Sequence, residues 1–161
     1  MNAYFTAIGR DSEWILQIDS DGQCDPQYFA KFWSERRYER PTYGQRRSRA
    51  DGIHRQLLSY GLRLLIRVAT GIDVRDSNVP YRLMHKSTLK RCLSCIPIDT
   101  PLPNVLLAVL HQYWFNIRWV TIHFRARQGG QSFHKFFLLI VLTGRLYKAL
   151  RRCFNSISKN L

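Results

Sequence analysis

Residues 13–26 read EWILQIDSDGQCDP, an apolar run that stops at a group of carboxylates. The large side chains from Glu13 to Ile18, followed by an Asp-Ser-Asp-Gly turn, predict a buried strand that leads into a loop. Asp19 and Asp21 then stand at the carboxyl end of that strand. In open α/β sheets ligands bind at this end of the strands, so the position favours a functional site.

The turn itself carries oxygen ligands at close spacing. Hard divalent cations prefer oxygen, and a D-x-D-x-Q turn presents two carboxylates and an amide oxygen to one point. Asp19, Asp21 and Gln23 are therefore candidate ligands for Mg²⁺ or Mn²⁺, with coordination sites left open for a diphosphate. The alternative is a solvated turn, because Asp and Gly are ordinary turn residues.

Helices are expected on both sides of a turn-rich segment at residues 41–52. The helix after Asp25-Pro26 carries aromatic side chains at helical spacing, which we expect in the core. These aromatics are Tyr28, Phe29, Phe32 and Trp33. A long helix is predicted over residues 52–70, with Gly71 as its C-cap. Its apolar stripe consists of Ile53, Leu57, Tyr60, Leu64, Leu65 and Val68.

The second half of the chain continues the alternation of strands and helices. A short extended piece follows Pro80, a helix starts near Lys86, and another helix covers residues 104–115. Residues 117–124 alternate apolar and polar side chains, which predicts a strand that Gly129-Gly130 ends. The predicted order is α/β, with too few strands to close a sheet unaided.

The charge of the chain predicts an anionic partner. Its 161 residues include 25 Lys and Arg against 11 Asp and Glu, a formal charge of +14. Nucleic acid, a phosphorylated ligand and an acidic membrane surface all fit this balance. The hydrophobic content of 45% is ample for one packed domain and argues against intrinsic disorder.

The cysteines and the two ends of the sequence bear on the cellular compartment of the protein and on its association with membranes. We expect a reducing cytoplasmic setting, since four cysteines form no dense disulfide framework and residues 1–14 lack the apolar core of a signal peptide. The run of residues 136–142 is too short to span a bilayer and leads into a basic amphipathic stretch. Residues 135–161 are thus either a helix on a membrane surface or a helix packed on the core with a solvated basic side.

Four segments in order resemble family-2 glycosyltransferases of the GT-A fold, and most closely those of the dolichyl-phosphate mannose synthase and polyprenyl-phosphate type. The carboxylate turn LQIDSDGQCDP resembles the metal-binding stretch of that family, and YGQRRSRADG its Gly-x-Arg segment. GIDVRDSNVPYRLMHKSTL resembles the Gly-x-x-x-x-Asp and Tyr-Arg-Leu segment, and RARQGGQS the late Arg-x-x-Gly-x-Ser turn. The resemblance covers nearly the whole chain.

The resemblance implies a fold and a set of partners. The fold would be the carboxyl-terminal portion of a GT-A domain over residues 1–134, an incomplete mixed sheet flanked by helices. The family's nucleotide-binding opening has no counterpart here, so we expect either a shortened enzyme or a catalytically inactive remnant that folds only with a partner chain supplying the missing half. The implied donor is a nucleotide-diphospho-sugar, and the implied acceptor a polyprenyl phosphate or a saccharide, at the inner face of the cytoplasmic membrane.

The resemblance also assigns roles to single residues. Metal at Asp19, Asp21 and Gln23 would neutralise the departing nucleoside diphosphate. Asp76 and Arg46 are the expected catalytic residues. Basic side chains are expected to position the phosphate, because the planar guanidinium suits phosphate oxygens. These are Arg46, Arg49, Arg82 and Arg127.

Alternatives remain for several of these residues. Asp76 and Arg82 could form a structural ion pair, the arginines could belong to a solvated basic face, and Asp51 is an N-cap or a base. Cys92 and Cys95 form an isolated C-x-x-C, for which buried thiols are the default. The competing function is a basic nucleic-acid-binding module, which the carboxylate turn and the scattered cations argue against.

Overall fold

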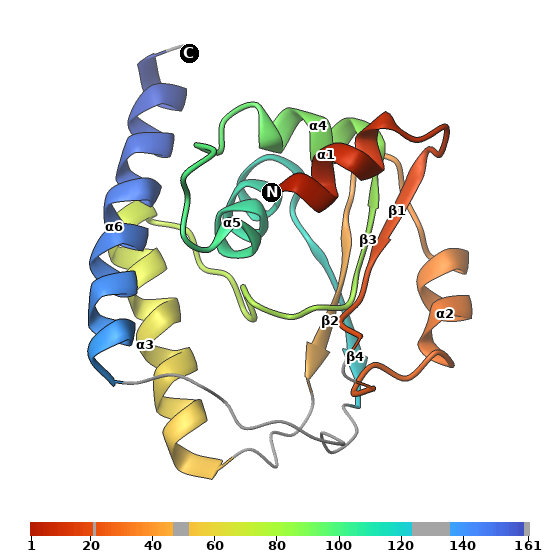
Figure 1. Cartoon of the computed structure of the whole chain (residues 1–161). Coiled ribbons are helices and arrows are strands. Elements are labelled where there is room, and N and C mark those ends of the chain that lie inside the picture. The colour runs from red at the N-terminus through yellow and green to blue at the C-terminus, as the bar shows by residue number, and fades with distance from the viewer. Residues whose placement is uncertain (21, 47–51, 124–135, 160–161) are drawn as a thin grey trace.

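The computed structural model describes residues 1–20, 22–46, 52–123 and 136–159. Strands and helices alternate along the chain except at α4 and α5, which follow each other (Figure 1). The elements are α1 (Asn2–Gly9), β1 (Trp14–Gln17), α2 (Tyr28–Ser34), β2 (Thr42–Arg46), α3 (Gly52–Thr70), β3 (Arg82–His85), α4 (Lys86–Leu93), α5 (Pro103–Phe115), β4 (Arg118–Ile122) and α6 (Phe136–Lys159).

A four-stranded mixed sheet in the order β1-β3-β2-β4 forms the centre of the molecule. β3 runs antiparallel to both β1 and β2, whereas β2 and β4 are parallel. β1, β2 and β4 therefore point the same way. Their last residues meet at one end of the sheet, together with the first residue of β3, and we call this the carboxyl end.

The helices cover the sheet in layers. In Figure 1, α4 and α5 lie on one face and α2 on the other, while α3 and α6 form an outer layer beyond α5. α5 lies between the sheet and that layer, and accordingly every residue from Val105 to His111 is buried. A helix that is covered on all sides has no need of a polar stripe, so its apolar side chains run almost continuously.

Most of the predicted elements are confirmed. The strand after Glu13, the helix over residues 52–70 and the helix that begins at Lys86 are present at the expected positions. Gly71 ends α3 with φ of 75°, and its N–H donates to the carbonyl of Arg67 at 2.8 Å. The four-stranded α/β architecture agrees with the predicted fold class at this coarse level.

The expected turn at residues 41–52 is wrong in its first half. Thr42–Arg46 is a central strand with neighbours on both sides. Gly44 makes room for a neighbouring strand: a Cβ at this position would lie 2.2 Å from Cδ1 of Ile122. The glycine therefore serves close packing between β2 and β4.

The apolar faces of two helices differ from the expectation. On α2 only Phe32 is buried, against Tyr81, whereas Phe29 and Trp33 are exposed. The reason is that α2 is short and meets the sheet along one row of side chains. On α3 the buried side chains are Ile66 and Ala69. Of the predicted stripe, Leu65 packs partly against the core, while Leu57, Tyr60, Leu64 and Val68 are exposed.

α6 packs against the body of the protein over the residues whose side chains are described. Leu146, Leu150, Cys153 and Ile157 are buried at helical spacing, and α6 packs against α3. This arrangement agrees with a core-packing helix that has a solvated basic side. None of the helices in the described ranges is long and apolar enough to cross a membrane.

Candidate functional site

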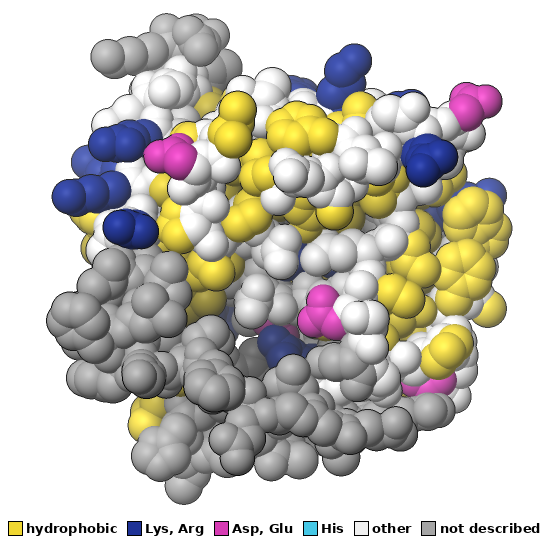
Figure 2. All heavy atoms as spheres, in the orientation of Figure 1, with side chains coloured by type: hydrophobic (Ala, Val, Ile, Leu, Met, Phe, Trp, Pro, Cys, Tyr) yellow, Lys and Arg dark blue, Asp and Glu magenta, His cyan; other side chains and the backbone are white. Residues whose placement is uncertain are grey.

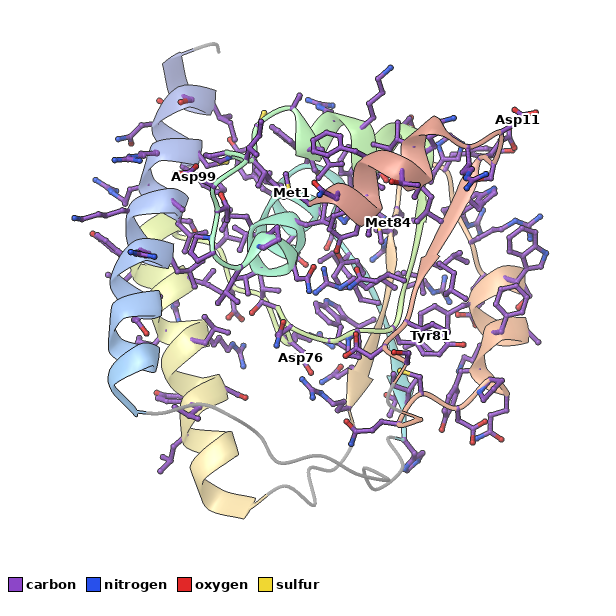
Figure 3. The ribbon with its side chains drawn as sticks, in the orientation of Figure 1. Met1, Asp11, Asp76, Tyr81, Met84 and Asp99 are labelled. Atoms are coloured by element: carbon purple, nitrogen blue, oxygen red, sulfur yellow. The ribbon has the colours of Figure 1, made fainter. Side chains whose placement is uncertain are left out.

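The candidate residues converge on the carboxyl end of the sheet because of the strand directions. Asp19 follows β1 by two residues, and Arg46 is the last residue of β2. Asp76 lies in the loop that leads to β3, and Figure 3 shows it beside the lower part of β2. Positions 19, 46 and 76 are far apart in sequence, so only the sheet topology brings these side chains to one end.

Arg46 and Asp76 form a two-point ion pair. Nε of Arg46 donates to Oδ2 of Asp76 at 2.8 Å, and Nη2 donates to Oδ1 at 3.0 Å. The Asp76 side chain is 8% exposed and that of Arg46 is 19% exposed. These two parallel hydrogen bonds fix the plane of the Arg46 guanidinium at the carboxyl end of the sheet. Asp76 thus accepts hydrogen bonds from Arg46 and orients it. The sequence had left open an ion pair between Asp76 and Arg82, but the structure pairs Asp76 with Arg46.

Arg82 is displaced from its expected role. Its side chain is completely buried, so in this structure it cannot line the acceptor side or meet a substrate phosphate. The guanidinium donates to backbone carbonyls of Val79, Ser77 and Asn104 at 2.7 to 2.9 Å. No carboxylate among the described residues pairs with it. Arg82 therefore ties the loop before β3 to the start of α5.

Two further polar side chains continue this buried group. The Arg82 guanidinium lies 4.6 Å from the ring centre of Tyr43, and the Tyr43 hydroxyl lies 2.9 Å from Nδ1 of His111. Burial raises the pKa of Tyr43, so the phenol stays protonated and shares a hydrogen bond with His111. Burial, together with the charge of Arg82, lowers the pKa of His111 to about 3. His111 is therefore a neutral imidazole.

The buried group was not foreseen from the sequence. Tyr43, Arg82 and His111 belong to three different elements, and no local spacing connects them. A weak signal existed, because His111 interrupts the apolar run of α5 where a helix buried on all sides should be apolar. Nε2 of His111 has no hydrogen-bond partner in the described part of the chain, so this polar atom is buried at a cost.

Tyr4 connects the buried group to the carboxylate turn. Its hydroxyl lies 2.7 Å from Oε1 of Gln17, at the end of β1, and 2.7 Å from Oδ1 of Asn104. Burial raises the pKa of Tyr4, the charge of Arg82 opposes the rise, and the carboxylate of Asp19 adds to it. Tyr4 thus lies within electrostatic reach of both the buried cation and the first carboxylate of the turn.

The predicted metal ligands are only partly described. Asp19 is exposed just beyond β1, and Gln23 is half-buried. Both carry the hard oxygen donors that Mg²⁺ and Mn²⁺ accept. Asp21 lies outside the described residues, as do Arg49, Asp51 and Arg127. Within the described ranges, which leave out Asp21, no three His, Cys, Asp or Glu side chains form a metal cluster.

One arginine at this end was missed. Arg75 is exposed beside Asp76, and its Nη1 donates to Oε1 of Gln45 at 3.2 Å. It shares the loop of Asp76 and projects toward β2, which adds a solvent-accessible cation to the carboxyl end. Its place in a run of alternating charges, DVRDS, gave no reason to prefer it over the other arginines.

Cys24 directly follows Gln23 in the carboxylate turn, whereas Cys92 and Cys95 lie in and just beyond α4 and Cys153 lies in α6. All four are free; Cys92 and Cys153 are buried, while Cys24 and Cys95 are half-buried. Burial raises the pKa of the Cys92 thiol, which keeps it protonated and unreactive. The C-x-x-C therefore agrees with the default of packed thiols.

Comparison of the chain with protein-family models, with curated proteins and with solved structures found no match.

Proposed function

We propose that the chain is part of a metal-dependent glycosyltransferase of family 2, with the GT-A arrangement of its sheet. One observation carries the proposal: strand directions bring Asp19, which begins the D-x-D turn, and the Arg46–Asp76 pair to the same end of the sheet. Scattered surface residues would have no reason to share that end. Ligands of open α/β sheets bind there.

Each residue has a role that follows from its position. Asp19, Asp21 and Gln23 would hold Mg²⁺ or Mn²⁺, which neutralises charge on the departing nucleoside diphosphate. Asp76 holds the guanidinium of Arg46 in one plane, and the positive charge of Arg46 would attract phosphate oxygens at this end of the sheet. Arg82 acts indirectly, as a positioning residue that anchors the loop carrying Asp76 through the Ser77 carbonyl.

The proposed acceptor is a polyprenyl phosphate. A phosphate is already anionic at neutral pH, so transfer to it requires cations that position it more than a base that activates it. The carboxyl end supplies Arg46 and Arg75 from described residues. Its buried carboxylate, Asp76, is engaged by Arg46, which suits orientation better than proton transfer.

Calorimetric binding of UDP and GDP, with Mn²⁺ and with chelator, tests the donor site. We expect metal-dependent binding by the wild type and a loss of at least tenfold in affinity for Asp19→Asn and for Asp21→Asn. Asp11→Asn is the matched control, because Asp11 is an exposed aspartate at the opposite end of β1 (Figure 3). Its affinity should equal that of the wild type.

Two outcomes would contradict the proposal. Folded wild-type chain that binds neither nucleotide would remove the donor site from this chain. Nucleic-acid affinity that falls steeply with salt, without metal-dependent nucleotide binding, would instead favour the basic nucleic-acid module.

A partner strand at β1 belongs to the same proposal. In the part of the chain that the structure describes, β1 has a neighbour on one side only, and its residues WILQ carry no charge. Natural edge strands usually carry charges or proline that prevent further pairing. We propose that a strand of the nucleotide-binding half pairs there. Co-expression with such a half should raise the yield of the chain, and Leu16→Lys should lower that gain.

A further inference from the structure

α3 exposes an apolar stripe along the side that faces away from the protein. The exposed fractions are 62% for Leu57, 69% for Tyr60, 51% for Leu64 and 67% for Val68. The spacing of three or four residues places all four on one face of the helix. These four residues belong to the stripe predicted from the sequence, and they lie in solvent.

The helix is nevertheless held firmly to the body of the protein. Ile66 and Ala69 are buried on the opposite side, and the guanidinium of Arg63 forms a two-point pair with Asp73 in the loop beyond α3. The orientation of α3 is therefore fixed by contacts of its own. Its exposed stripe is a stable feature of the surface.

α6 adds positive charge beside this stripe. The two helices pack against each other and both begin at the lower end of the molecule in Figure 1. Figure 2 shows the Lys and Arg side chains gathered at upper left, over α6. The exposed cations of its outer side are Arg145, Lys148, Arg151 and Arg152.

The charge balance of the two helices is one-sided. α3 contains three Arg and α6 contains five Lys and Arg, and neither helix contains Asp or Glu. A second copy of the chain docked on this surface would bring like charges together. Anionic lipid headgroups are instead complementary to the cations, and acyl chains to the apolar stripe.

We propose that α3 and α6 together bind the surface of an anionic lipid bilayer, with Leu57, Tyr60, Leu64 and Val68 inserted at the headgroup boundary. The α3–α6 surface denotes these four residues with the four exposed cations of α6. The inference stands whether or not the chain transfers sugar. If it does, α3 follows β2 after a short segment, so the bilayer lies close to the carboxyl end of the sheet.

Flotation with lipid vesicles tests the inference on the full chain. We expect the wild type to float with vesicles of phosphatidylcholine and phosphatidylglycerol, and to float far less with phosphatidylcholine alone. Leu64→Glu should reduce the bound fraction at least tenfold. Phe29→Glu is the matched control, because Phe29 is an apolar residue that is 42% exposed on α2, on the face of the sheet away from α3 and α6. It should float as the wild type does.

A second pair of variants separates the contribution of charge. Lys148→Gln with Arg152→Gln should weaken binding to anionic vesicles, whereas Arg37→Gln, at an exposed position beyond α2, should not. Circular dichroism of each variant verifies that it is folded. Wild type that ignores anionic vesicles, or Leu64→Glu that floats normally, overturns the inference. A dimer in light scattering that Leu64→Glu dissociates, without vesicle binding, would assign the surface to self-association and also overturn it.

Discussion

Arg82 and Arg46 stand on neighbouring strands, and the protein uses them in opposite ways. Arg82 is sealed in the core, where carbonyls of three residues accept its hydrogen bonds. Arg46 ends its strand at the carboxyl end, where its partly exposed side chain is held by the carboxylate of Asp76. The comparison teaches that an arginine in a motif can serve binding or architecture, and that its partners distinguish the two.

The sharpest test is to remove the buried cation. Arg82→Met should lower the free energy of unfolding by about 3–5 kcal/mol, because the carbonyls of Val79, Ser77 and Asn104 lose their donor inside the core. Chemical denaturation measures the change. Arg75→Met is the control at an exposed position and should cost no more than about 0.5 kcal/mol. An equal effect of both substitutions would erase the distinction between core and surface arginines.

Gly44 tests the strand that joins the two regions. β2 carries Tyr43 in the core and Arg46 at the carboxyl end, and Gly44 allows it to approach β4. Gly44→Ala should cost about 1–3 kcal/mol, since the new Cβ would meet Cδ1 of Ile122 at 2.2 Å. Ile122→Val removes that atom, so the double variant should lose less than the sum of the two single losses. Strict additivity would show that the contact is not the cause.

The pH dependence of stability below pH 6.5 contains a contribution from the buried group. The folded-state pKa of His111 is about 3 and its ordinary value is 6.5. Above pH 6.5 His111 is neutral in both the folded and the unfolded chain, so it does not change the free energy of unfolding. As pH falls from 6.5 toward 3 the unfolded chain takes up the proton, so this residue should cost about 1.4 kcal/mol per pH unit. In His111→Gln the free energy of unfolding should fall less steeply with decreasing pH, by that amount per pH unit. An unchanged slope would contradict the assignment of His111 as a buried neutral imidazole.

The smallest effect on stability is expected at the carboxyl end. Arg46→Lys keeps the charge but loses the two-point geometry with Asp76, at a cost of about 1 kcal/mol or less. On the proposed function it should nevertheless weaken metal-dependent nucleotide or phosphate binding at least tenfold by calorimetry. Arg63→Lys alters a similar two-point pair, with Asp73, on α3. If Arg63→Lys weakens binding equally, the assignment of Arg46 to the site fails.

Local sequence patterns predicted those parts of the fold that depend on near neighbours. The apolar run before Asp19 gave β1, and the long periodic segment gave α3 with its glycine cap. The site was predicted in part: Arg46 and Asp76 were named separately, and their pairing was not. The buried group of Tyr43, Arg82 and His111 escaped prediction because its members meet only when β2, β3 and α5 pack together.

α3 and α6 show which properties of a helix the sequence determines and which depend on tertiary packing. α3 and α6 both have apolar side chains at helical spacing, and that periodicity by itself determined that each is a helix with one apolar face. Only the packing decided that Leu150 and Cys153 of α6 are buried while Leu64 and Val68 of α3 are exposed. The reason is that 3.6 residues per turn is a local property, whereas burial depends on residues that the chain brings from elsewhere.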